Sequence, residues 1–316
     1  MTVVALSGGV GGAKLALGLY RALPPDSMTV IVNTGDDFDH LGLRICPDLD
    51  TMLYTLAGLE HTERGWGRRD ETWTLMRVIA SLGVEPWFQL GDADTALHVV
   101  RTHRLSRGAC LSEVIREFRV HLGITAEILP MTDFRVETRV DTEDGELAFQ
   151  EYFVRRRCQP RVRKIRFAGA AEAAPAPGVH AALTAEALDA IVLCPSNPYL
   201  SIDPLLATPG LQALLRQRRV PLIAVSPLIG GTAVKGPTAK IMSELGIESS
   251  AQAIAAHYHG LIDGLVIDLA DAAAARSIPI PVFTTATLMK TLADRMRLAH
   301  FVLQCARELS HGNPAR

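Results

Sequence analysis

The N-terminal segment of this chain joins an apolar run to a cluster of glycines. Residues 3–6 are Val-Val-Ala-Leu, and residues 7–12 are Ser-Gly-Gly-Val-Gly-Gly. The apolar run is typical of a buried strand, and Ala13 to Arg21 is predicted to form the first helix. Glycine lets the backbone turn tightly and approach a ligand, while the start of a helix attracts anions. We therefore predict a phosphate-binding loop, with contacts from Gly8, Gly9, Gly11, Gly12 and Lys14.

This loop matches neither of two common phosphate motifs. The dinucleotide fingerprint requires a third Gly or Ala at the position of Lys14. The P-loop requires Gly-Lys-Ser/Thr, whereas here Ala13 separates Gly12 from Lys14 and Leu15 follows. An ordinary glycine-rich turn is one interpretation, and a phosphate cradle of a less common kind is the one we favour.

Composition narrows the class of protein. The chain has 316 residues, a formal net charge of −2 and a pI near 6.6, which argues against nucleic acid as a partner. We read the basic stretch 155–166 as a solvated face or an oligomer contact. We expect no signal peptide, because no basic region precedes an apolar segment and cleavage site at the N-terminus. We expect no membrane span, because no apolar run reaches about 18 residues. The five cysteines form no Cys-x-x-Cys pair, which favours reduced thiols in the cytoplasm.

Apolar runs recur along the chain and predict the fold class. They lie at residues 28–33, 190–194, 220–225, 264–268 and 280–284. Such runs, separated by helical segments, are typical of the inner strands of a parallel sheet. We predict one α/β domain over residues 1–316, with a Rossmann-like, mostly parallel sheet flanked by helices. An insertion at about residues 55–167 is predicted to be mainly helical and then β, with a small hairpin at Asp144-Gly145.

Acidic residues follow the second predicted strand. Residues 33–37 are Asn-Thr-Gly-Asp-Asp, and residues 46–51 are Cys-Pro-Asp-Leu-Asp-Thr. The carboxyl ends of parallel strands share one edge of a sheet, so these acids are expected to lie beside the glycine loop. Carboxylates near phosphate need a cation between them, and oxygen ligands are typical of Mg²⁺. Candidate binding residues are Asp36, Asp37 and Asp50, whereas Asp48 is equally well explained as a helix cap.

The second half of the chain offers further polar strand ends. Ser196 and Asn197 lie between two prolines that hold the turn extended, so both side chains can face a ligand. Ser226 opens a second glycine-rich loop that continues to Lys235. This cationic loop suits the other end of a nucleotide diphosphate.

Two features of the predicted insertion remain open between binding and packing. Asp94 and His98 lie one helical turn apart, which allows an acid and imidazole pair or a helix cap followed by a packed histidine. Trp66, near several arginines, can stack on a flat heterocycle or pack in the core.

These motifs together resemble a known family. They are Ser7 to Lys14, Asn33 to Asp37, Cys46 to Thr51, Gly91-Asp92-x-Asp94, Pro195-Ser196-Asn197-Pro198-x-x-Ser201-Ile202 and Ser226-Pro227-x-Ile229-Gly230. Their order is similar to that of the 2-phospho-L-lactate transferase family (CofD/FbiA), which builds the deazaflavin coenzyme F(420). The resemblance runs over nearly the whole chain.

The resemblance implies a transferase. A phosphorylated three-carbon acid, linked to guanosine through a diphosphate, would pass to the ribityl hydroxyl of the deazaflavin Fo, and GMP would leave. Asp36 is expected as the principal Mg²⁺ ligand, with Asp37 as a second ligand and Asp37 or Asp50 orienting the hydroxyl. The ring of Fo would lie near Thr51 and Trp66 of the insertion, and a homodimer is expected. The implied substrate contacts are the glycine loop, Lys14, Asn33, Asp92, Asp94, His98, Ser196, Asn197, Ser226 and Lys235.

The chain departs from the family pattern at two positions. Many members carry Arg where Ala93 stands and Thr where Leu97 stands. We therefore hypothesise an altered preference among phospholactate, phosphoenolpyruvate and phosphoglycerate donors. The alternative function is a regulator of the gluconeogenesis-factor type, which binds nucleotide-sugars without catalysis. A nicotinamide oxidoreductase is a third, disfavoured because the dinucleotide fingerprint fails.

Overall fold

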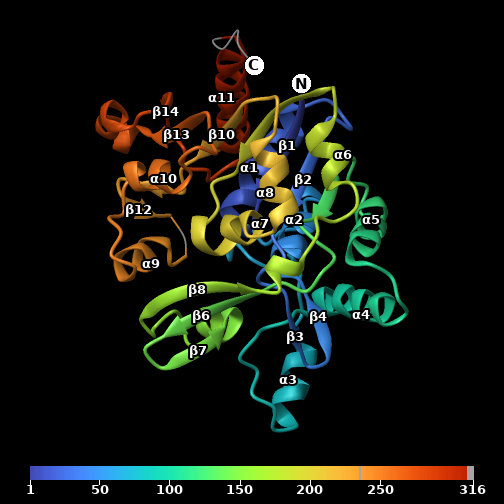
Figure 1. Ribbon diagram of the computed structural model, residues 1–316. Helices are drawn as coiled ribbons and strands as arrows, with labels where there is room; N and C mark the ends of the chain where they lie inside the picture. The colour runs from blue at the N-terminus through green and yellow to red at the C-terminus, as the bar shows by residue number, and fades with distance from the viewer. Residues whose placement is uncertain (235, 312–316) are drawn as a thin grey trace.

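A seven-stranded parallel sheet forms the centre of the protein (Figure 1). In this computed structural model, residues 1–234 and 236–311 are described. Every neighbouring pair of strands in the sheet is parallel, as the sequence predicted. The strands, in sheet order, are β14 (Val282–Thr285), β13 (Gly264–Asp268), β10 (Leu222–Val225), β9 (Leu188–Leu193), β1 (Thr2–Ser7), β2 (Met28–Val32) and β5 (Glu127–Pro130).

The sheet is buried on both faces because successive side chains of a strand point to opposite sides. In β1, Val3 and Ala5 belong to one hydrophobic core, and Val4 and Leu6 belong to the other. The first core is covered by α1 (Gly9–Ala22), α2 (Pro47–Leu56), α5 (Leu111–His121) and α11 (Leu292–His311). The second is covered by α6 (Val179–Thr184), α7 (Asp203–Leu206), α8 (Pro209–Arg216), α9 (Thr238–Glu244) and α10 (Ala251–His257).

The strand order has a switch point beside β1. From β1 the chain adds β2 and β5 on one side, and it later adds β9, β10, β13 and β14 on the other. In open parallel sheets, ligands bind outside the carboxyl ends of the strands at such a point. The turns that follow β1 and β9 meet there, because the Gly8 N–H donates to Ser196 Oγ at 3.1 Å.

The predicted insertion at residues 55–167 requires a correction. β5 lies inside this range, yet it pairs with β2 and forms an edge of the central sheet. Residues 55–167 are therefore two excursions rather than one. The first carries α3 (Thr74–Ser81) and α4 (Asp92–Ser106) before the chain returns through α5 to β5. Its helical content agrees with the prediction.

The second excursion is a small antiparallel sheet. Its strands, in order, are β7 (Gly145–Ala148), β6 (Glu137–Thr142) and β8 (Val162–Ala168). β6 and β7 form the predicted hairpin, and Gly145 has the positive φ of 107° that its turn requires. Residues Glu151–Arg155, which follow this hairpin, form a π-helical turn.

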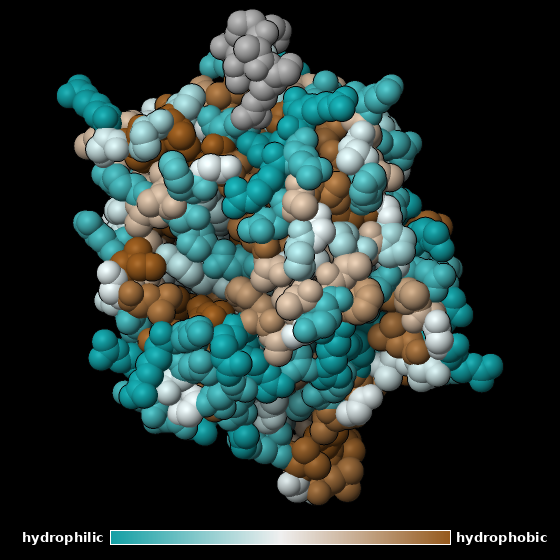
Figure 2. Space-filling view, viewed as in Figure 1, coloured by the Kyte–Doolittle hydropathy of each residue, from teal (hydrophilic) through white to brown (hydrophobic). Residues whose placement is uncertain are grey.

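Two short hairpins and an exposed helix complete the fold. The hairpins are β3 (Phe38–His40) with β4 (Leu43–Ile45), and β11 (Leu228–Ile229) with β12 (Thr232–Ala233). α3 projects from the body of the protein, and an apolar patch covers its end (Figure 2). Leu82, at the end of α3, is 77% exposed. Within the described part of the chain, no helix combines the length and apolar character needed to cross a bilayer.

Candidate active site

The glycine loop is shorter than the sequence predicted, because α1 begins at Gly9 rather than Ala13. Gly9 has a φ of +64°, which is a backbone conformation that favours glycine. Its N–H donates to Asp48 Oδ1 at 2.6 Å, so a carboxylate of this chain already occupies the start of the helix. An anion that binds the Gly9 N–H must therefore displace Asp48.

Three other glycines of the loop are required by close packing within the protein. A Cβ atom on Gly8 would meet Asp48 Oδ2 and Ser201 Cβ, each at 2.6 Å. One on Gly11 would meet the carbonyl oxygen of Pro195 at 2.5 Å. Gly12 faces the hydroxyls of Ser7 and Ser196 at a distance that admits no Cβ. These glycines let the ends of β1 and β9 approach each other, which sets the shape of the site.

Asn33 connects the glycine loop to the acidic residues. Its Nδ2 donates to Asp48 Oδ2 at 2.9 Å and to Asp36 Oδ1 at 3.4 Å. Its Oδ1 accepts the N–H of Gly35 at 2.8 Å. Asn33 is fully buried, so both ends of its amide serve to hold this turn and its carboxylates.

Asp36, Asp37 and Asp48 form a desolvated acidic cluster. Burial raises the pKa of Asp36 well above its usual value, and the neighbouring Asp48 and Asp37 raise it further. Burial raises the pKa of Asp37 to about 7, although a hydrogen bond with Cys46 lowers this pKa in part. Burial also raises the pKa of Asp48 to about 6. Negative charge is costly here, so the cluster has the electrostatic character of a cation site.

The donor set fits one specific manner of metal binding. Asp37 Oδ1 is buried and has no hydrogen-bond partner among the described residues. In that same part of the chain, no three His, Cys, Asp or Glu side chains are grouped as a set of metal ligands. The acids therefore suit a hard cation that is held by one or two carboxylates and completed by phosphate oxygens and water, as is usual for Mg²⁺.

Asp50 lies in a buried ion-pair network that the sequence did not predict. Arg101 of α4 is fully buried and forms a two-point ion pair with Asp50. His98 Nδ1 lies 3.5 Å from Asp50 Oδ2, and its Nε2 lies 3.3 Å from Asp94 Oδ2. Tyr54 donates to Asp94 Oδ1 at 2.6 Å. Of the two interpretations that the sequence left open for Asp94 and His98, the structure shows the acid and imidazole pair, and Asp50 faces Arg101.

Helical spacing could have grouped Arg101 with Asp94 and His98, although it does not reveal the ion pair with Asp50. Positions 94, 98 and 101 follow at intervals of four and three residues, so they share one face of α4. Asp92 lies on the same helix and serves a different role. It accepts the backbone N–H groups of Thr74 and Leu75 at the start of α3, at 3.1 and 2.9 Å.

The predicted polar residues after β9 and β10 are at the same edge of the sheet. Asn197 Oδ1 accepts the N–H groups of Tyr199 and Leu200, at 3.0 and 3.2 Å. Its Nδ2 is buried and has no partner within the described ranges, so it is available as a donor. Ser226 Oγ accepts the Leu228 N–H at 3.2 Å. Lys235 lies outside the described residues.

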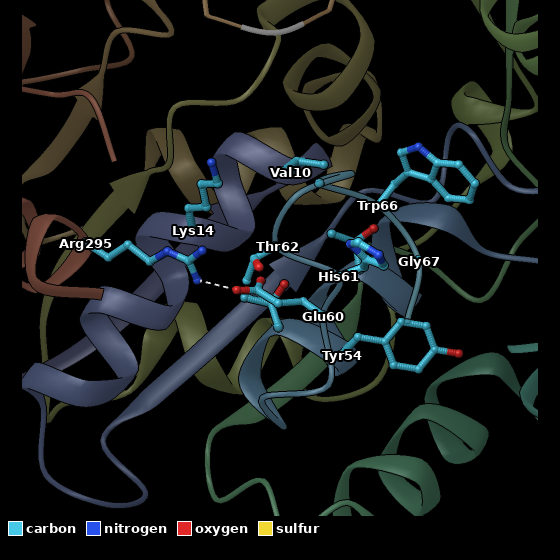
Figure 3. Close-up of a pocket in the computed structure, with 12 residues that line it drawn as sticks. Val10, Lys14, Tyr54, Glu60, His61, Thr62, Trp66, Gly67 and Arg295 are labelled. Carbon is cyan, nitrogen blue, oxygen red and sulfur yellow. Dashed lines mark hydrogen bonds and ion pairs between the residues drawn. The ribbon is translucent and has the colours of Figure 1, made fainter. Parts of the chain in front are cut away.

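A small pocket of about 20 Å³ lies beside α1 (Figure 3). It brings together Lys14, Thr51 and Trp66, three of the predicted substrate contacts, with Tyr54. The Lys14 ammonium donates to the Met289 carbonyl at 3.2 Å. Trp66 is 48% exposed, so its ring is not a core residue. Residues that the sequence did not single out also line this pocket, namely Glu60, His61 and Arg295.

The sequence of this chain is similar to those of known transferases. Residues 3–279 match the family model described as 2-phospho-L-lactate transferase CofD. A phosphoenolpyruvate transferase of Streptomyces griseus is 44% identical over 284 residues, which cover 88% of this chain and 89% of that protein. A 2-phospho-L-lactate transferase of Methanocaldococcus jannaschii is 38% identical over 306 residues, which cover 96% and 97%.

A solved structure from Bacillus halodurans, described as a member of the upf0052 family, shares the fold. Its TM-score is 0.65 at 16% sequence identity, and the match covers 96% of this chain and 100% of that one. The likeness supports the α/β architecture.

Proposed function

This chain belongs to the 2-phospho-L-lactate transferase family, and from that premise we propose that it performs a late step of coenzyme F(420) biosynthesis. In that step, a ribityl hydroxyl of Fo attacks the phosphorus that carries a three-carbon acid in a guanosine diphosphate-linked donor. A P–O bond to Fo forms, the P–O–P bridge breaks, the hydroxyl loses its proton and GMP leaves. Phosphoryl transfer of this kind depends on positioning and on neutralising charge.

One observation carries the proposal: the acidic cluster of Asp36, Asp37 and Asp48 lies against the glycine loop at the switch point of the sheet. A diphosphate beside three buried carboxylates is repelled unless a cation intervenes. When bound between Asp36 and Asp37, Mg²⁺ would neutralise the transferring phosphate. We assign Asp36 as the principal ligand and Asp37 as the second.

The remaining roles are assigned from the position and the present partners of each polar group. Asp37 Oδ1 lacks a partner among the described residues, and we assign it to orienting the attacking hydroxyl. Asp50 is engaged by Arg101, so we assign it to charge balance and orientation within the site. The start of α1, Asn197 Nδ2 and Lys14 would hold the diphosphate, and Thr51, Tyr54 and Trp66 would contact Fo.

A variant of Asp36 tests the catalytic role. In Asp36→Ala, we expect GMP release to fall by at least about 100-fold, as for loss of a charge-stabilising group. Binding of GDP, measured by calorimetry without metal, is expected to persist. Asp39→Ala is the matched control, because Asp39 is a half-exposed acid that pairs with Arg44 and Arg135. Full turnover in Asp36→Ala would remove Asp36 from the mechanism.

We propose that the donor carries one of three acids, namely phospholactate, phosphoenolpyruvate or phosphoglycerate. The regulatory alternative predicts nucleotide binding without turnover in the unaltered protein. The same assay therefore separates the two functions.

A further inference from the structure

Arg295 is a buried cation in the substrate pocket. It lies in the first turns of α11, its side chain is 6% exposed, and it lines the pocket together with Lys14 of α1 (Figure 3). Its Nη1 donates to Glu60 Oε1 at 2.7 Å. Its Nε is buried without a hydrogen-bond partner among the described residues. The guanidinium therefore retains a donor that its present environment leaves unused.

The backbone of Arg295 is fixed by the crossing of α1 and α11. At this crossing, Gly18 faces the carbonyl group of Arg295 so closely that no Cβ would fit. A Cβ on Gly18 would also meet Ala299 Cβ at 3.2 Å. Arg295 is thus carried on two packed helices, and such rigid elements suit a residue that positions a ligand.

The residue that pairs with Arg295 belongs to a hairpin-like segment, which we call the 59–69 segment. Its two ends are joined by the Arg69 N–H, which donates to the Leu59 carbonyl at 2.8 Å, and by a bridge between Glu60 and Arg68. Gly58, with a φ of +70°, precedes it. Trp66 lies near its tip and exposes half of its surface. The segment is therefore a compact unit that Glu60 ties to α11.

The pocket beneath this segment is too small for a substrate. A volume of about 20 Å³ admits about one water molecule, whereas small-molecule sites are on the order of 300–1,000 Å³. A larger ligand reaches Arg295 only if the lining moves, and the 59–69 segment contributes half of the lining residues. Movement requires that the pair between Glu60 and Arg295 separates, and a buried guanidinium then needs a new anion.

We propose that Arg295 binds a phosphate group of the substrate, and that Glu60 is a resident anion which this phosphate displaces. The 59–69 segment is then a lid, and exchange of the carboxylate for phosphate on Arg295 opens it. A guanidinium donates two parallel hydrogen bonds to phosphate as readily as to carboxylate, so the exchange keeps the cation paired throughout. The identity of the phosphate as part of a diphosphate donor rests on the proposed function, whereas the exchange itself needs no group transfer.

The test uses inorganic pyrophosphate as the probe and the full-length protein. Glu60→Gln keeps the size of the side chain and removes the competing charge, so pyrophosphate is expected to bind about 5- to 10-fold more tightly by calorimetry. Arg295→Met is expected to weaken binding at least about 10-fold. Arg295→Lys keeps the charge but loses the paired N–H donors of the guanidinium. Its affinity for pyrophosphate is expected to lie between those of the unaltered protein and Arg295→Met. It replaces Arg295→Met in the test if that variant unfolds. Arg297→Met is the matched control, since Arg297 is a half-exposed neighbour that pairs with Asp294.

Lid movement has its own signal in Trp66. The part of the acrylamide quenching of tryptophan fluorescence that disappears in Trp66→Phe comes from this ring. This quenching is expected to increase when pyrophosphate is added. In Glu60→Gln it is expected to be high without any ligand. Unchanged pyrophosphate affinity in both Glu60→Gln and Arg295→Met would overturn the proposal. If binding and quenching follow the expected pattern but no donor is turned over, the exchange stands and the proposed function fails. If turnover is normal with unaltered KM in every variant, the proposed function stands and the exchange fails.

Discussion

The backbone N–H of Gly9 donates to the carboxylate of Asp48 across 2.6 Å, which joins the start of α1 to the first turn of α2. Asn33, at the end of β2, donates to the other oxygen of the same carboxylate at 2.9 Å. Three segments of the chain therefore meet on Asp48. From the sequence, Asp48 could be either a helix cap or a binding residue. In the structure its side chain is buried and reaches the neighbouring helix. Asp48 holds the glycine loop in place.

Asp48→Ala is expected to destabilise the protein by about 1–3 kcal/mol at pH 5, because the N–H groups of Gly9 and Asn33 lose their acceptor in a buried site. The pKa of Asp48 is raised to about 6, so its stabilising contribution is full below about pH 4 and is lost as pH rises through 6. The deficit of the variant should therefore be smaller at pH 8. Urea denaturation at both pH values measures it, and a larger deficit at pH 8 would contradict the assignment.

Asp37 predicts a dependence of stability on pH and on metal. Its pKa is raised to about 7, so the metal-free protein loses stability as pH rises from about 4 through 7. Asp37→Asn lacks this loss, so the free energy of unfolding of the variant, relative to that of the unaltered protein, should rise by about 2–3 kcal/mol between pH 5 and pH 8. Mg²⁺ should stabilise the unaltered protein at pH 8 more than the variant. Parallel pH profiles of unfolding free energy, with no effect of Mg²⁺, would count against the acidic cluster as a cation site.

We predict that truncation of the Arg101 side chain lowers the free energy of unfolding by a large amount. Arg101→Met leaves Asp50 buried without its partner, which typically costs about 3–5 kcal/mol. Replacement of both residues, in Arg101→Met with Asp50→Leu, removes the unpaired charge and should cost much less than the sum of the single changes. Urea denaturation of the four proteins gives the coupling energy. Additive costs would show that the pair is not a unit.

The general architecture could be predicted because local patterns agreed with the global fold. The apolar runs of β1, β2, β9, β10 and β13 are buried on both faces, as such runs are in parallel sheets. Since all of these strands are parallel, the polar residues after them share one edge, and Ser196 met the glycine loop as expected. The same reasoning brought Asp36 next to Asp48.

β5 was placed wrongly because strand pairing is a long-range property. The strands that follow it in sequence, β6 and β7, form the hairpin of the predicted insertion at residues 55–167, and β5 lies within the same range. The distinguishing signal is that Ile128 and Leu129, adjacent in sequence, are both buried, as in a strand covered on both faces. In β6, by contrast, buried and half-buried residues alternate.

Arg101 and Arg295 escaped prediction for a different reason. Arginine is seldom fully buried, so the sequence gives no reason to place either residue in the interior. Their burial depends on acids distant in sequence, Asp50 and Glu60, which only the folded chain brings near. Tertiary pairing of this kind leaves no pattern along the chain.

We predict that the residue at position 93 influences which of the three donors is preferred. Its N–H donates to Glu71 Oε2 at 2.9 Å at the start of α4, one residue before Asp94. Ala93→Arg, which introduces the residue that the family resemblance leads us to expect here, adds a cation that can bind the carboxylate of the three-carbon acid. We expect the ratio of kcat/KM values between the three donors to change by about 10-fold or more, as one good charge-assisted contact supplies. An unchanged ratio would separate Ala93 from donor choice.

The most direct test of the proposed transfer is mass spectrometry of the reaction products. The protein is incubated with Fo, Mg²⁺ and each of the three guanylylated donors in turn, with and without a chelator. The account predicts release of GMP and addition of one phosphoacid to Fo, both abolished by the chelator. Absence of product from all three donors, while GDP still binds, would contradict it and favour the regulatory function.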